Sequence, residues 1–86
     1  MASVCRVSTR MTVADLARGA RTDVARHGAA VLLGAASQAR QLRRLQAALR
    51  AGGYQARYLS DGSAEHVLVV TAPGQEMPRS LGWWGG

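Results

Sequence analysis

The sequence contains no phenylalanine, no isoleucine and no lysine, and it carries only five acidic residues. Apolar residues fill 48 % of its 86 positions, but sixteen of them are alanine. Any core must therefore be built from leucine, valine and alanine. A chain this short buries only about 60–65 % of its unfolded surface. We therefore expect one small domain of modest stability, which excludes a large enzyme.

Cysteine is scarce as well. Cys5 is the single cysteine, so an internal disulfide and a disulfide-stapled fold are excluded. We expect Cys5 to be a partly buried strand residue. His27 and His66 lie far apart in the sequence, and no zinc-binding spacing is present, so we predict neither a metal nor a cofactor. A single cysteine is compatible with a reducing compartment, and we expect a cytoplasmic protein.

Long apolar runs and catalytic constellations are missing as well. The longest uncharged run, residues 27–39, is rich in alanine, is interrupted by two glycines and is too short for a bilayer, so we predict no membrane partner. No paired carboxylates and no glycine-rich phosphate loop occur, and the sequence places no nucleophile beside His66. We therefore predict that the protein is not an enzyme, and that His66 is a surface residue or the cross-strand partner of Arg57.

Positive charge is what the sequence has in excess. Eleven arginines against five acids give a net charge of +6 and a pI near 11.4. Ten of the arginines and only two acids fall in residues 1–57, a net charge of +8. The remaining residues carry one arginine and three acids, a net charge of −2. Such asymmetry indicates the partner rather than the fold, and it favours nucleic acid or an acidic protein surface.

Apolar spacing predicts helix in the first half of the chain. Thr12 has the character of an N-cap with Asp15 three residues later, and an apolar face follows with helical period. Residues 13–27 form either one helix with a soft point at Gly19 or two short helices, of which the second begins at Thr22. Gly28 is the expected break.

The clearest segment is a basic amphipathic helix over residues 35–51. Its leucines fall within one narrow arc, and Gly52 and Gly53 follow as the expected C-terminal cap. The opposite side carries Arg40, Arg43, Arg44 and Arg50. No acid occurs from Val24 to Leu59, so no local carboxylate neutralises these arginines.

A β-hairpin is predicted in the second half. Residues 54–59 and 64–71 flank Asp61-Gly62, a strong two-residue turn signal that places Leu59 opposite Ala64. Residues 67–70 are apolar on both faces, which favours a strand with two neighbours, and residues 2–8 are a candidate for the second. Tyr54 and Tyr58 share one face, where we expect packing against a helix rather than base stacking.

These elements predict an α+β fold of two to three helices followed by a β-hairpin, either with or without a third short N-terminal strand. Residues 1–72 form the single domain in this interpretation. Heptad-like spacing between Val24 and Leu49 favours a short antiparallel helix pair, within one chain or across a possible homodimer.

Residues 73–86 are rich in proline and glycine, and we expect a flexible tail. Among its apolar residues are Leu81, Trp83 and Trp84. Exposed tryptophan is costly and is enriched at binding hot spots. Two interpretations remain open: the tail docks on a partner, or it folds back over the core of its own chain.

The order of these elements resembles that of winged helix-turn-helix DNA-binding domains over residues 11–71. MTVADLAR is similar to the first helix of that motif, and the stretch ARQLRRLQAALRAGGYQARYLSDGSAEHVLVVT is similar to a recognition helix followed by a wing. Some twenty residues separate Ala17 from the arginine helix, so an additional helix over 22–34 is required. The resemblance implies that Arg43 and Arg50 contact phosphates and that Arg57 serves the wing. It also implies that a further set faces the major groove: Ser37, Gln38, Arg40, Gln41 and Arg44.

The leading hypothesis is therefore a small non-enzymatic nucleic-acid-binding or regulatory protein. Its basic helix would supply the contacts, through Arg40, Gln41, Arg43, Arg44 and Arg50, with Arg57 on the hairpin. The alternative is an interaction or assembly subunit, in which the arginine face meets an acidic protein surface. Partner contacts would then also come from Leu81, Trp83 and Trp84.

Overall fold

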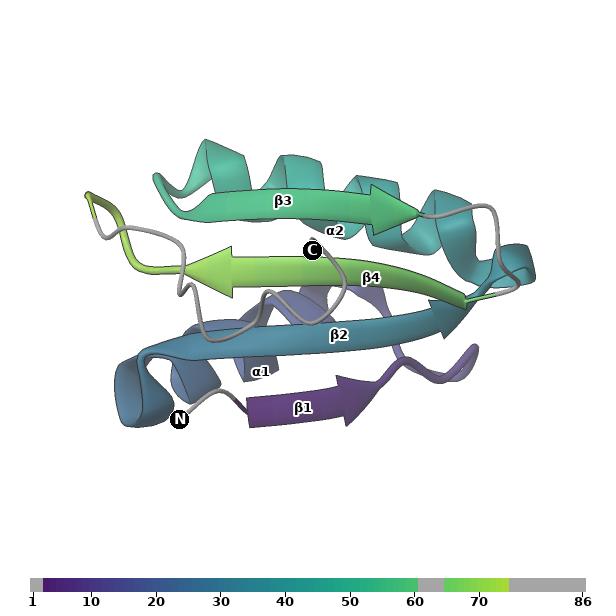
Figure 1. Ribbon diagram of the computed structural model, residues 1–86, viewed down its shortest axis with the longest axis horizontal. Coiled ribbons are helices and arrows are strands. Elements are labelled where there is room, and N and C mark those ends of the chain that lie inside the picture. Colours follow the sequence, from purple (N-terminus) through teal and green to yellow (C-terminus); the bar gives the residue numbers. More distant parts are fainter. Residues whose placement is uncertain (1–2, 61–64, 75–86) are drawn as a thin grey trace.

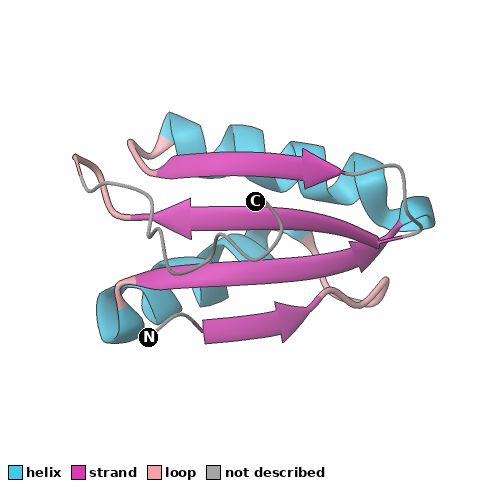
Figure 2. Cartoon of the chain, in the orientation of Figure 1, coloured by secondary structure: helices cyan, strands magenta, loops and turns pink. Residues whose placement is uncertain are grey.

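The computed structural model of the protein describes residues 3–60 and 65–74. Within these ranges the chain forms two helices, one short 3-10 helix and four strands. Figures 1 and 2 show their arrangement. Their bounds are β1 Ser3–Arg6, α1 Val13–His27, β2 Ala29–Ala35, η1 Ala36–Gln38, α2 Ala39–Ala51, β3 Gln55–Ser60 and β4 Glu65–Thr71.

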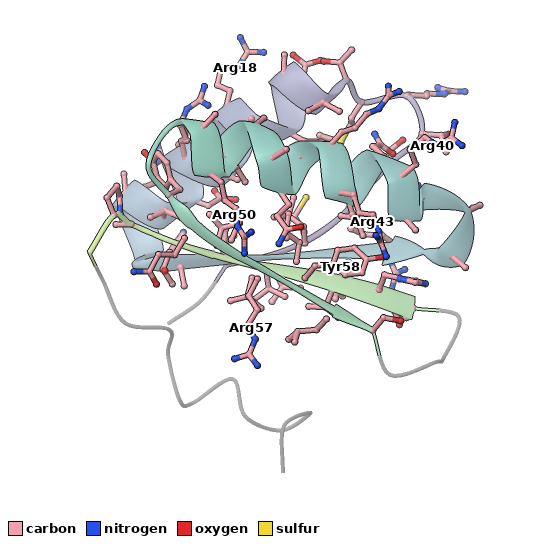
Figure 3. All side chains as sticks on the ribbon, turned by 90° about the horizontal axis from the view of Figure 1, so that it is seen from above. Arg18, Arg40, Arg43, Arg50, Arg57 and Tyr58 are labelled. Carbon is pink, nitrogen blue, oxygen red and sulfur yellow. The ribbon has the colours of Figure 1, made fainter. Side chains whose placement is uncertain are left out.

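The strands form a single four-stranded mixed sheet in the order β1-β2-β4-β3. β1 and β2 are parallel, and β4 pairs antiparallel with both β2 and β3. Both helices cover the same face of this sheet (Figures 1 and 3), so the chain has one helix layer and one sheet layer. The predicted α+β class is confirmed, although strands alternate with helices instead of following them.

α1 forms as one continuous helix rather than as two short ones. The Thr12 side chain accepts a hydrogen bond from the backbone N–H of Asp15, which confirms the predicted N-cap. Gly28 ends the helix in the left-handed region with φ of 85°, a conformation that glycine adopts without steric cost. The helix therefore continues through Gly19, although glycine inside a helix is about 1 kcal/mol less favourable than alanine.

Residues 29–35 form the central strand β2, so the predicted helix over 22–34 is wrong. Within β2, all residues up to Leu32 are buried, and its apolar side chains point to both faces of the sheet. A strand buried on both faces is a continuous apolar run, which periodicity cannot distinguish from a buried helix. The basic helix consequently begins at Ala39, after η1, rather than at residue 35. A strand thus separates α1 from α2.

The β-hairpin is confirmed, but its predicted register is wrong. Leu59 pairs with Val67 rather than with Ala64, because β3 ends at Ser60 and β4 begins at Glu65. Asp61 and Gly62, the predicted turn residues, lie outside the described part of the chain. The second neighbour of β4 is β2, and the N-terminal strand lies at the sheet edge against β2, which corrects the expected pairing.

The main core lies between the helices and the sheet. Leu42, Leu45 and Leu49 of α2 are fully buried there, together with Leu68 and Val70 of β4. Tyr54 and Tyr58 are partly buried against this core, as predicted for tyrosines that pack on a helix. Cys5 is partly buried on β1, again as predicted.

The opposite side of the sheet, which we call the second face, carries a separate apolar cluster. Successive strand residues point to alternate faces, so Val31, Val67 and Val69 lie on this side. Leu33 and Leu59 are partly buried against them.

Candidate nucleic-acid interface

The exposed side of α2 carries four arginines on one helix. Leu42, Leu45 and Leu49 bury the opposite side completely, which fixes the rotation of the helix about its axis. The exposed set, which we call the α2 arginine face, is Arg40, Arg43, Arg44 and Arg50. Ten residues separate its ends, which at 1.5 Å per residue corresponds to about 15 Å along the helix axis.

Arg43 is held against the sheet by an aromatic ring. Its guanidinium carbon lies 5.2 Å from the centroid of the Tyr58 ring, within the range of a cation–π contact. A hydrogen bond joins the Tyr58 hydroxyl to Nδ1 of His66 on the neighbouring strand. The predicted pairing of His66 with Arg57 is wrong, because His66 lies opposite Ser60. Arg43, Tyr58 and His66 therefore form one polar cluster. Figure 3 shows Arg43 of α2 beside Tyr58 of β3.

Arg50 is fixed by the edge strand. Its Nε donates a hydrogen bond of 3.2 Å to the carbonyl of Ala56, which also accepts one of 3.0 Å from Gln46 Nε2. β3 is an edge strand, so no further strand donates a hydrogen bond to this carbonyl, and the two side chains of α2 donate to it instead. Only Nε takes part in this hydrogen bond, so the two terminal nitrogens of Arg50 can still donate hydrogen bonds to an anion.

Arg40 and Arg44 differ from this anchored pair. They are four residues apart, lie one turn apart on the exposed side of the helix, and have no ion pair or hydrogen bond within the described part of the chain. The two ion pairs that join described residues are Arg6–Glu65 at 2.7 Å and Arg18–Asp15 at 2.6 Å. Neither ion pair neutralises the α2 arginine face.

Gln41, which was predicted to face a ligand, bonds to the protein instead. Its Nε2 donates to the carbonyls of Met11 at 2.7 Å and Ser8 at 3.4 Å, in the loop between β1 and α1. Gln38 makes a similar bridge: its Nε2 donates to the carbonyl of Val7, and its Oε1 accepts from the N–H of Ala35. These two glutamines connect the N-terminal end of α2 to the loop between β1 and α1.

Arg57 lies apart from the α2 arginine face. It is exposed on β3 opposite Val69, and Figure 3 shows it pointing away from the helix layer. Because Ala56 and Tyr58 point toward α2, Arg57 between them points to the second face. The structure therefore brings together Arg43 and Arg50 with β3, and places Arg57 on the other side of the sheet.

The remaining predicted residues lie outside the described part of the chain: Leu81, Trp83 and Trp84 of the tail, and Asp61 of the hairpin turn. Among residues 3–60 and 65–74, no group of three metal-ligating side chains comes together. Within the same ranges, no helix has the length and apolar character needed to cross a membrane.

Two contacts of the site escaped the sequence analysis. Tyr58 was expected to pack against a helix, but its contact with Arg43 was not predicted. Gln46, which shares the Ala56 carbonyl with Arg50, was not predicted at all. Both contacts depend on the packing of α2 along β3, for which the local sequence carries no signal.

The arrangement suits the recognition of phosphate. A guanidinium presents a planar fork of donors that matches the oxygens of a phosphate and keeps its charge at any physiological pH. In the α2 arginine face, two such forks are anchored through β3 and two extend into solvent, with no acid on α2 itself. Comparison with known proteins gave no match to a family model, to a curated protein or to a solved structure.

Proposed function

We propose that the protein is a small non-enzymatic nucleic-acid-binding protein that contacts backbone phosphates through the α2 arginine face. The observation that carries the proposal is the group of four exposed arginines on one helix side, none of them in an ion pair among the described residues. Binding phosphates at such a site releases condensed counterions from the nucleic acid, which is a sequence-independent source of affinity.

The charge of the neighbouring helix supports α2 as the centre of this surface. α1 carries Arg18, Arg21 and Arg26 but also Asp15 and Asp23, so its arginines and acids nearly cancel. α2 carries four arginines and no acid. An approaching polyanion therefore meets its strongest attraction at α2, with α1 as a weaker extension of the same layer.

A salt titration tests the proposal directly. Fluorescence anisotropy measures binding to a labelled DNA duplex and to a single strand of mixed sequence, over a range of salt concentrations. We expect binding at low salt that weakens linearly in a plot of log K against log salt concentration. Absence of binding at low salt, or a flat slope, contradicts the proposal and leaves the acidic protein surface as the partner.

A further inference from the structure

The centre of the second face is buried although both helices pack on the other side of the sheet, whereas Val4 on the edge strand β1 is 64 % exposed on the same face. Val31 and Val69, which pair across β2 and β4, are only 3 % and 2 % exposed, and Val67 is 8 % exposed. Thr71, at the end of β4 on the same side, is 0 % exposed. A sheet buries its apolar residues by packing against another element. A layer other than α1 and α2 therefore covers this face.

We infer that this layer is the C-terminal segment of the same chain, residues 75–86, with Trp83 and Trp84 as its apolar anchors. The inference concerns the face opposite the α2 arginine face, and it stands independently of nucleic-acid binding. It also gives a role to the tryptophans, which the proposed function does not use.

The end of β4 directs the chain toward this face. Pro73 and Gly74 follow the strand, and Gly74 has φ of 77°. Proline followed by a residue of positive φ is the pattern of a type II turn, which reverses the chain direction. A chain that turns back after the last strand runs along the sheet rather than away from it.

The length of the segment is sufficient. β4 has seven residues and spans about 23 Å at the rise of a strand. Trp83 lies nine residues beyond Gly74, which is a reach of about 30 Å in an extended chain. The indoles can therefore reach any valine of the cluster, and each buries about 150–250 Å² when packed.

Charge favours this occupant over a second copy of the protein. The exposed charged residues on the second face are Arg57 and the ion pair of Arg6 with Glu65. Segment 75–86 brings one acid, Glu76, and one base, Arg79, so it is neutral and can offer a carboxylate to Arg57. A two-fold dimer through the second face would instead place this face against its own copy. Two copies of Arg57 would then lie close together and repel each other.

NMR spectroscopy of the full chain tests the inference without any substitution. We expect nuclear Overhauser effects between the indole protons of Trp83 or Trp84 and the methyl groups of Val31, Val67 and Val69. These signals must persist in a sample of labelled protein diluted into excess unlabelled protein. Signals found only between labelled and unlabelled chains would assign the face to a second copy and overturn the inference, as would their complete absence.

Tryptophan fluorescence gives an independent readout, because Trp83 and Trp84 are the only tryptophans. We expect native emission at shorter wavelength than that of the urea-unfolded chain. Val69→Lys, which places a charge in the cluster, should shift the emission to the unfolded wavelength while the far-UV circular dichroism stays native. The matched control is Ala25→Lys on the exposed side of α1, which should leave the emission unchanged. Native emission equal to that of the unfolded chain, or unaffected by Val69→Lys in a folded protein, refutes the inference.

Truncation completes the test. Removal of residues 75–86 should lower the Tm by about 10 °C, the shift expected in a domain of this size when a large apolar contact is lost. The truncated chain should keep the salt-dependent binding of the α2 arginine face. An unchanged Tm contradicts the inference, whatever the result for nucleic acid.

Discussion

Replacing Arg40 and Arg44 by glutamine removes half of the α2 arginine face and yields a quantitative test of the proposed interface. Both side chains are exposed and have no partner among the described residues. Their loss should change the free energy of unfolding by less than about 0.5 kcal/mol, as is usual for surface positions. An effect on binding therefore reports the interface and not the fold.

The magnitude follows from the number of phosphates contacted. If each of the four arginines neutralises one phosphate of a duplex, the slope of log K against log salt is about −3.6, and the double variant should show about −1.8. Between about 50 and 200 mM salt, affinity then falls about 150-fold for the native protein and about 12-fold for the variant. Extrapolated to about 1 M salt the two lines meet, so at about 50 mM the variant binds about 200-fold more weakly.

The matched control removes the same charge from the other side of the sheet. Arg6→Gln with Arg57→Gln also lowers the net charge by two, but these residues lie on the second face. We expect the control to keep the slope of the native protein. Anisotropy titrations of the three proteins decide the question. An equal loss of slope in the control would refute the reasoning, because it would mean that net charge rather than the helix face governs binding.

Three further substitutions test hydrogen bonds and packing elsewhere in the domain. Gln41→Ala should cost about 1–2 kcal/mol in urea unfolding, because the carbonyls of Ser8 and Met11 lose their donor, and it should leave the salt slope unchanged; a lower slope would make Gln41 a ligand contact. Thr71→Val should stabilise the protein by about 1 kcal/mol, a rise in Tm of about 4–8 °C, since its buried hydroxyl finds no hydrogen-bond partner within the described residues; a lower Tm would reveal one. Leu45→Ala, at a fully buried position, should cost about 2–5 kcal/mol in the same unfolding assay, and a loss below about 1 kcal/mol would contradict its place at the centre of the core.

The basic helix could be predicted because its two sides differ so sharply. Three leucines within one arc and four arginines outside it leave a single orientation of the helix in which the apolar side is buried. The exposure of Arg40 and Arg44 follows from the same period. The two ends of α1, at Thr12 and Gly28, could also be predicted, because a helix cap depends on local hydrogen bonds and backbone angles.

β2 could not be recognised, because burial on both faces removes the alternation by which a strand is usually identified. Its alanines also fit a helix. The error extended to the topology: without a strand at 29–35, β4 lacked its true neighbour, and residues 2–8 were assigned to that place. The predicted register of the hairpin was wrong for a different reason. An Asp-Gly pair is a signal for a turn, but it does not determine how many residues connect the two strands.

The site was predictable only where it depends on α2 alone. Gln41 lies beside the buried stripe, at a position from which a long side chain can either reach a ligand or bend toward the protein. The choice depends on the loop between β1 and α1, which tertiary packing brings to within hydrogen-bond distance. The same holds for the contact of Arg43 with Tyr58 and that of Arg50 with Ala56, which join residues of two different elements.

These tertiary contacts give the four arginines unequal roles in the proposed interface. A long side chain that becomes immobilised on binding loses about 0.5–1.5 kcal/mol of rotamer freedom. Arg43 and Arg50 have lost part of that freedom already, because Tyr58 and the Ala56 carbonyl hold them in the free protein. Arg40 and Arg44 must be ordered by the ligand itself. All four can contribute equally to the salt slope, which counts neutralised phosphates, while the anchored pair along β3 contributes more affinity for each phosphate. In the proposed interface, the packing of α2 on an edge strand thus preorganises two of the four arginines as hydrogen-bond donors to phosphate.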